Sequence, residues 1–234
     1  MKEARAVQNA FQTLFFTGLA LMSTGFVKAQ DEKMFWPDKD RINYHFSTPI
    51  LLNSPVDLGS SGFSNSHEID LMTETKMGRT VSLGIGLGYG SHNLHTALNI
   101  RYDAAVPGEV IEVLPDSLEY SHNKLNVKYI TLPVELRFRW PTPSGRYVRT
   151  YVGARLGYGI AAYSRLTTDD ARLAYSRLSS VNPWATSVYI RLGYSMFGVY
   201  ASYGLTPLFR AGAQVDGADL QPVRMLNLGI SISG

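Results

Sequence analysis

Apolar and polar residues alternate with a period of two along most of this chain, most regularly in residues 125–140. Every even position from Ile130 to Trp140 is apolar, whereas the odd positions include Glu135 and two arginines. Successive side chains of a β-strand point to opposite faces, so this segment predicts a strand with one apolar and one charged face.

The same alternation recurs in several other segments and predicts further strands there. These segments are 41–49, 66–76, 146–165, 183–196, 197–206 and 222–233.

Residues 79–103 also alternate, but their apolar positions change parity near Ser91–Asn93. A β-bulge shifts the parity of a strand by one residue, so we interpret this region as one long bulged strand. A hairpin at Gly90–Asn93 is the alternative interpretation.

The spacers between these strands alternate in length. Transmembrane barrels have short turns on the periplasmic side and longer loops outside. With the bulged strand the count is eight, so we expect an all-β fold: an eight-stranded antiparallel transmembrane β-barrel, an up-and-down meander with periplasmic termini and extracellular long loops. The long spacers are 50–65, 104–124, 166–182 and 207–221, and the short ones are 77–78, 141–145 and 197–198.

Soluble all-β folds fit the pattern less well. Their strands average about 5–6 residues, whereas the two most regular segments here run to 16 and 20 residues. A soluble ligand-binding barrel has an apolar interior, the inverse of a narrow interior lined by Arg, Glu, Tyr and Gly.

The N-terminus has the features of a cleavable signal peptide. Lys2 and Arg5 precede an apolar run, Leu14–Met22, and Val27–Ala29 offers small residues before Gln30. That run is far short of the ~20 residues that a spanning helix needs. We therefore predict a signal peptide at 1–29, a short periplasmic segment at 30–40 and an outer-membrane barrel domain at 41–234.

Composition narrows the possible chemistry. The 234 residues carry a net charge of +3, of which +2 lies in residues 1–29, so the rest is too balanced to suggest nucleic acid binding. There is no cysteine, which excludes a thiolate metal site and a cysteine nucleophile.

Nine charged residues occupy the polar parity of the predicted strands and are expected to face the lumen. An eight-stranded barrel is just wide enough for its side chains to fill it, so we expect a charge-paired filling, with an ion-selective lining as the alternative. These residues are Glu68, Asp70, Glu74, Glu135, Arg137, Arg139, Arg149, Arg155 and Arg191.

Aromatic residues of the apolar parity cluster near the strand ends, as in the two interfacial girdles of membrane barrels. The expected girdle residues are Phe138, Trp140, Tyr194 and Phe197 on one side, and Tyr158, Trp184 and Tyr203 on the other.

Catalytic signals are weak. No phosphate-binding loop, dinucleotide fingerprint or HExxH motif occurs, so we expect no catalytic residue, cofactor or metal site. A rim-located enzyme would use residues near the predicted outer rim: His92, His95, Asp116, Ser117, Ser121 and His122.

Two long loops carry more apolar residues than solvated loops need. Residues 104–124 contain Val110 and Ile111, and residues 166–182 contain Leu173 and Leu178. These side chains either bind a partner or pack on one another.

The segments LGIGLGYGSHNLH, KLNVKYITLPVELRFRW, YVGARLGYGIAAY and LNLGISIS resemble the PorT-like group of Bacteroidetes outer-membrane β-barrel proteins. The most specific element is Tyr129–Pro133. The resemblance covers roughly residues 40–233 and implies an eight-stranded barrel of the porin-family small type in the outer membrane. Such chains usually end in an aromatic residue read by the barrel-assembly machinery, whereas this one ends in Ile232-Ser233-Gly234.

We expect a non-catalytic integral outer-membrane protein of the cell envelope. Its partners would be the lipid bilayer, the barrel-assembly machinery and another envelope protein bound through the loops. A small diffusion channel, a rim-located enzyme and an extracellular-loop adhesin are the alternatives.

Overall fold

The alternating segment around residue 130 forms strand β6 (His122–Pro141) in the computed structural model, which describes residues 40–58, 63–102, 108–115, 117–169 and 171–234. Odd residues of β6 from Asn123 to Arg139 point inward and are buried, Arg137 completely. Even residues point outward, and Ile130 is 46% exposed. The predicted signal peptide and residues 30–39 lie outside the described residues.

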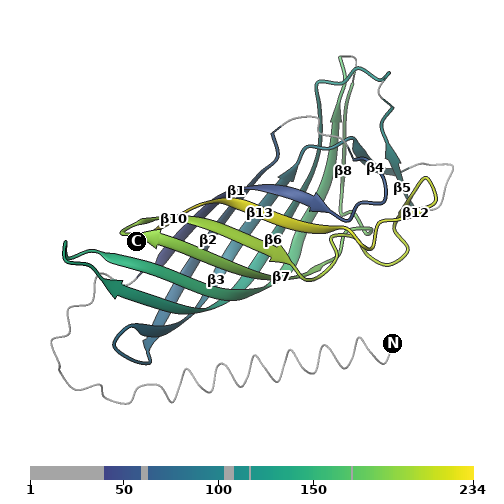
Figure 1. The fold of residues 1–234 in the computed structure, drawn as a ribbon. Helices are drawn as coiled ribbons and strands as arrows, with labels where there is room; N and C mark the ends of the chain where they lie inside the picture. Colours follow the sequence, from purple (N-terminus) through teal and green to yellow (C-terminus); the bar gives the residue numbers. More distant parts are fainter. Residues whose placement is uncertain (1–39, 59–62, 103–107, 116, 170) are drawn as a thin grey trace, which may run out of the picture. The chain divides into compact units, whose positions relative to one another are not determined.

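Eight long strands form a ring of antiparallel pairs (Figure 1). Each pairs with the long strands before and after it along the chain, and the first pairs with the last. Besides β6 they are β1 (Ile42–Leu52), β2 (Asn65–Lys76), β3 (Val81–Leu94), β7 (Tyr147–Thr167), β9 (Trp184–Tyr194), β10 (Phe197–Gly204) and β13 (Arg224–Ser233).

The register around the ring is staggered. Following paired residues from Trp140 through every strand in turn leads back to β6 at Ile130, ten residues away. A ring of tilted strands needs such a stagger, and an even value keeps outward-facing residues outside when the ring returns to its start.

The connections alternate in length as the spacers predicted. Residues 77–80, 142–146 and 195–196 make tight turns at one end of the ring, the short-turn end. The long connections 53–64, 95–121, 168–183 and 205–223 lie at the other, the loop end. Ile42 and Gly234 exchange backbone hydrogen bonds of 2.8 and 2.9 Å, so the start of β1 and the end of β13 lie side by side at the short-turn end.

Residues 79–103 are neither one bulged strand nor a hairpin at Gly90–Asn93. β3 keeps one register with β6 from Val81 to Leu94, and the chain then leaves the ring to form β4 (Leu98–Tyr102). β4 pairs with β5 (Glu109–Val113) instead. The parity of β3 never changes; the interior itself becomes apolar at Leu94.

A register shift occurs in β7 instead. Tyr129 pairs with Gly159 and Lys128 with Ala161, so Ile160 is the extra residue of a β-bulge. Beyond it the parity of β7 inverts, and Ala162 packs against the interior cluster. Tyr163, which the alternation of 146–165 places inward, therefore faces outward.

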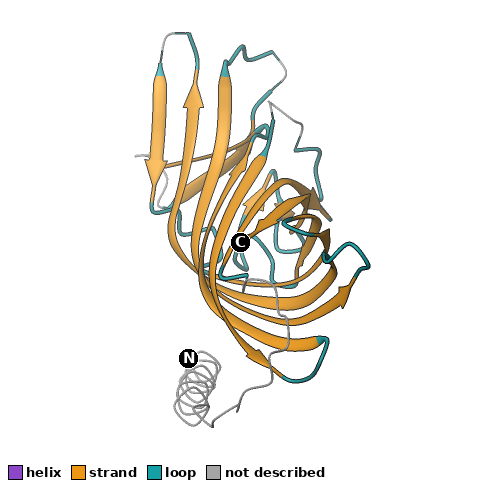
Figure 2. Ribbon diagram, turned by 90° about the vertical axis from the view of Figure 1, so that its left-hand side faces the viewer, coloured by secondary structure: helices purple, strands orange, loops and turns teal. Residues whose placement is uncertain are grey.

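Some strands run on past the rest of the ring at one end, as Figure 2 shows, and the pairing of residues 122–128 with 161–167 identifies two of them as β6 and β7 at the loop end. There the small strand β8 (Arg172–Ser176) pairs with the last residues of β7, Tyr163–Thr167. We call these residues 122–128, 161–167 and 172–176 the strand extension. A further short hairpin, β11 (Gln214–Val215) and β12 (Ala218–Asp219), lies in the last long connection.

The described part of the chain contains no helix long and apolar enough to cross a membrane.

Candidate functional site

The inside of the ring near the short turns is filled by ion pairs. Arg137 Nη1 lies 2.7 Å from Glu74 Oε2, and Arg139 binds both oxygens of the same carboxylate. Asp40 joins them through Arg139 (3.2 Å) and Arg149 (2.7 Å).

Glu135 lies at the centre of this interior. Its carboxylate accepts a hydrogen bond of 2.6 Å from Arg137 Nε and two bonds from Arg191 Nη2, at 2.6 and 2.7 Å. The Tyr189 hydroxyl donates a further one at 3.0 Å. Charge-assisted pairs of this kind satisfy groups that burial would otherwise penalise.

Arg155 makes the pairs closest to the loop end. Its two terminal nitrogens lie 2.7 Å from Glu68 and 2.7 Å from Asp70. Tyr200 donates to Glu68 at 2.7 Å, and the His45 ring stacks on Tyr200 with centroids 4.4 Å apart.

All nine charged residues expected in the lumen make ion pairs, in two sets: Arg155 with Glu68 and Asp70, and the other six with Asp40. Tyr189 links the two sets, because it donates to Glu135 and its ring centroid lies 4.9 Å from the guanidinium carbon of Arg155. We call the nine residues and Asp40 the lumen network. Pattern reasoning missed Asp40 because this residue precedes the first alternating segment. One signal pointed to it: four predicted acids faced five arginines. Asp40 brings the described network to five carboxylates and five guanidinium groups.

Glycines of β3 make room for these long side chains. A Cβ on Gly88 would lie 2.1 Å from Asp70 Oδ1, and one on Gly84 would lie 2.8 Å from Arg137 Nε. Both distances are far below ordinary contact, so the glycines at the inward positions of β3 leave room for the network.

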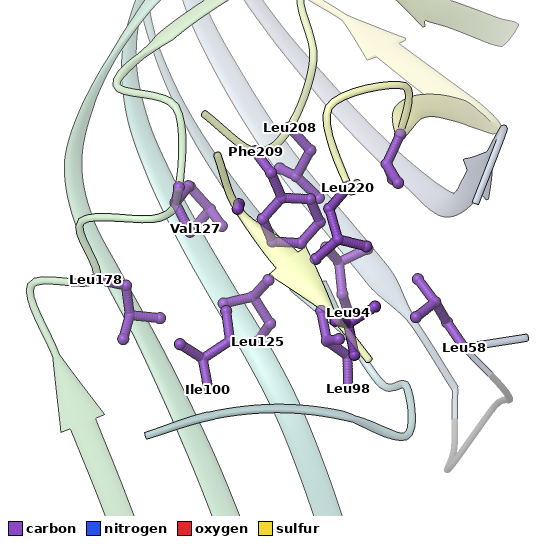
Figure 3. Packing of buried hydrophobic residues seen from close by; sticks show 14 of the residues in the cluster. Leu58, Leu94, Leu98, Ile100, Leu125, Val127, Leu178, Leu208, Phe209 and Leu220 are labelled. Carbon is purple, nitrogen blue, oxygen red and sulfur yellow. The ribbon is translucent and has the colours of Figure 1, made fainter. Parts of the chain in front are cut away.

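Beyond the lumen network, towards the loop end, buried apolar side chains fill the interior, and Figure 3 shows how they pack together. Inward residues of β3 and β6 meet residues of the long connections, and Ile100, Phe209 and Leu220 are completely buried. We call this set the loop-end cap. Its members are Leu58, Leu94, Leu98, Ile100, Leu125, Val127, Leu178, Val181, Leu208, Phe209, Ala213, Val215, Leu220 and Val223.

The apolar loop residues thus pack mainly on the molecule itself. Leu178 belongs to the cap, and Ile111 and Val113 pack against it. Leu173 on β8 is different, since it remains 43% exposed.

Hydrogen bonds fasten the connections to one another outside the cap. Glu109 of β5 accepts hydrogen bonds from the backbone of Ser179 and, at 2.8 Å, of Ser180. Burial raises the pKa of Glu109, but these hydrogen bonds outweigh it and hold the pKa below its usual value.

A small cavity of about 50 Å³ lies between the lumen network and the cap, lined among others by Glu68, His92, Tyr129 and Arg155. A water molecule needs ~10–15 Å³ measured in this way, so the cavity has room for only a few of them.

Residues of the rim-enzyme alternative come together only in part: His95 and His122 lie close enough for the charge of His122 to lower the pKa of His95, whereas His92 and Ser121 have other partners. His92 is buried inside the ring and bonds Ser66 Oγ at 2.8 Å, with Glu68 3.9 Å away. Ser66 Oγ in turn donates to Asn227 Oδ1 at 3.2 Å. Ser121 bonds the backbone oxygen of Thr167 in the strand extension, and Asp116 is outside the described residues.

The described residues hold no group of three or more His, Cys, Asp or Glu side chains arranged to bind a metal ion.

The expected girdle residues lie on the outer surface. At the short-turn end, strand pairing places Trp140, Tyr194 and Phe197 at the same level of the ring. The rings of Phe138 and Trp140 stack there, with their centroids 6.1 Å apart. At the other side Tyr158 meets Trp184 edge to face at 5.0 Å. Tyr203 on β10 is half-exposed, opposite Val188.

An eight-stranded ring with an apolar outside and a charged inside is the arrangement of a membrane-inserted β-barrel. A family model described as "Outer membrane protein beta-barrel domain" matches residues 30–210. The chain belongs to this family of outer-membrane proteins, and lipid surrounds its apolar outer face.

Other comparisons add little. A search of curated proteins finds no match. Among solved structures, a mutant of Rh. blastica porin is 9% identical, with 82% of this chain and 98% of that chain covered, and a TM-score of 0.21. A triple mutant of Rhodopseudomonas blastica porin is 8% identical with the same coverage and TM-score. Scores this low carry no argument about fold or function.

Proposed function

We propose that this protein is a sealed, non-catalytic outer-membrane barrel that acts through its loop end as a structural or accessory component of the envelope. The long loops would face the cell exterior, and residues 1–29 would be a signal peptide removed on export. The family match begins at residue 30, directly after that segment, which supports this assignment.

The filled interior carries the proposal. A permeating ion would meet the lumen network, in which Arg137, Arg155 and Glu135 are all bound to opposite charges and nearly inaccessible. It would then meet a cap of buried apolar side chains. Either layer alone obstructs a pore, since hydrophobic constrictions exclude water and paired charges do not rearrange freely.

An accessory role is supported by the strand extension. In the described pairings β8 has a partner on one edge only, so its other edge presents free backbone groups. Such an edge is a template on which an extended segment of another protein adds a strand.

Within the outer-membrane barrel family, the Tyr129–Pro133 element of β6 supports the proposal that this chain is a PorT-like protein.

Solute flux tests the sealed barrel. We expect liposomes containing the purified protein to swell no faster in an isotonic sugar or amino-acid solution than liposomes without it. Swelling at a porin-like rate would contradict the proposal.

Cysteine labelling tests the orientation, because the chain has no native cysteine. Ala174→Cys on β8 should react with a membrane-impermeant maleimide on intact cells, whereas Ser144→Cys in a short turn should react only after permeabilisation. The reverse result would invert the proposed topology.

A further inference from the structure

The outer face of the ring changes abruptly from apolar to polar near the loop end. Ile69, Tyr89, Ile130 and Tyr158 occupy neighbouring outward positions on β2, β3, β6 and β7 and are all exposed. These residues are suited to the hydrocarbon or its interface.

Four residues further along β6 the outward positions are amides. Asn126 donates to Asn93 at 2.6 Å, and Asn93 donates to Asn65 at 2.9 Å, which makes a polar row across β6, β3 and β2. Amide groups are costly in hydrocarbon. The hydrocarbon boundary therefore lies between Ile130 and this row.

Basic residues occupy the outward face of the strand extension at and beyond that boundary. Lys128 and Lys124 lie on β6, Arg165 is paired with Lys124 across the sheet, and Arg172 lies on β8. Lys128 and Arg165 share the Tyr163 ring, with the ammonium nitrogen and guanidinium carbon 5.6 and 5.9 Å from its centroid. We call these four cations the basic face.

The basic face has no counter-charge within the described part of the chain. None of its four residues forms a salt bridge there, whereas the five lumen arginines are all paired. The Nε of Arg165 is buried without a hydrogen-bond acceptor. The positive charge of the basic face also acts on the neighbouring loop. Burial lowers the pKa of His95 there, and the charges of Lys124 and His122 lower it further.

We propose that the basic face binds the phosphate groups of lipid headgroups in the leaflet at the loop end. Lysine and arginine at headgroup depth attract anionic lipids, and arginine matches the oxygens of a phosphate. The proposal needs only that the ring spans the membrane, so it stands whether or not the lumen conducts.

Lipid binding by the detergent-solubilised full-length protein tests this proposal. Native mass spectrometry would compare retention of phosphatidic acid, which carries a phosphomonoester, with retention of phosphatidylcholine. We expect tighter binding of phosphatidic acid, weakened about fivefold in Lys128→Gln and about a hundredfold in a variant with Lys124, Lys128 and Arg165 all changed to Gln.

The control is Arg210→Gln, which removes an exposed cation at the loop end outside the basic face. It should leave the preference unchanged. Heat-modifiable gel mobility would show whether each variant is folded. If the triple variant does not fold, Lys128→Gln alone is enough to test the proposal.

Inorganic phosphate distinguishes a lipid site from a free-anion site. Phosphate alone should displace the lipid only weakly. The proposal is overturned if free phosphate competes at equal concentration, if the wild type shows no preference, or if folded Lys128→Gln retains the full preference.

Discussion

The two halves of the interior are both filled by side chains, but by side chains of opposite chemistry. Near the short turns, strand residues and Asp40, which precedes β1, supply the filling, and long charged side chains satisfy one another across the ring. Near the loop end, β3 and β6 contribute apolar residues to a cluster completed by the connections. The long connections are therefore part of the core at the loop end, whereas at the short-turn end the strands need only Asp40 from outside the ring to complete the ion pairs.

Breaking the lumen network should have the largest effect on stability. Glu135→Ala leaves Arg137 and Arg191 buried without their shared carboxylate, which typically costs about 3–5 kcal/mol in the free energy of unfolding. Urea titration in detergent or lipid, followed by tryptophan fluorescence, measures it.

The control for this prediction is Arg101→Ala, which breaks the partly exposed pair with Glu112 and leaves Glu112 as the acceptor for the buried Asn99 side chain. Exposed pairs contribute about 0–1 kcal/mol, so this variant should unfold close to the wild type. Equal losses in the two variants would show that the lumen network is not a buried ion-pair system.

Breaking the cap should act more locally. Leu98→Ala removes a buried side chain of the cap and should cost about 2–5 kcal/mol in the local stability of the loop end. Because the cap joins connections to the ring, limited proteolysis should cut 95–121 and 205–223 faster while the ring strands stay protected in hydrogen exchange. Leu173→Ala, which removes an exposed leucine, is the control, and equal protease sensitivity in the two variants would argue against the cap.

Acidification should loosen the loop end by a smaller amount. The depressed pKa of Glu109 means that its hydrogen bonds to residues 179 and 180 stabilise the fold above the usual glutamate pKa of about 4.3. This contribution is lost as the pH falls below that value, through the lower pKa of the folded protein. Hydrogen exchange at the Ser179 and Ser180 amides should therefore accelerate with falling pH relative to Glu109→Gln, and identical pH profiles would contradict this.

Much of the ring could be predicted from the sequence, because in most of it apolar side chains point outward and polar side chains point inward. In residues 125–140 the outward positions face one medium and the inward positions another, so a period of two reveals the strand. The alternation of spacer lengths then fixes which strands are joined by tight turns, and the ring of eight strands matches that prediction.

The rule that inward positions are polar and outward positions apolar fails where residues of the long connections enter the lumen. Leu94 is apolar and points inward, because residues of the cap and not other charges surround it. The pattern therefore suggested a change of parity in β3 that does not exist. The real bulge at Ile160 was hidden, because Ala161 and Ala162 are small residues that tolerate either face.

The charged residues of the lumen were identifiable one by one, but their partners were not. Arg155 binds acids 85 and 87 residues away along the chain, and only the staggered register brings them together. Asp40 was outside every alternating segment, so only the charge balance of the interior pointed to it.

Single-channel recording in planar bilayers tests the two-layer interior most directly. Wild-type protein should give no unitary current, and Leu98→Ala should stay silent too, because the lumen network remains when the cap is loosened. Steady unitary conductance from the wild type would show that a continuous water path exists and would contradict a sealed interior.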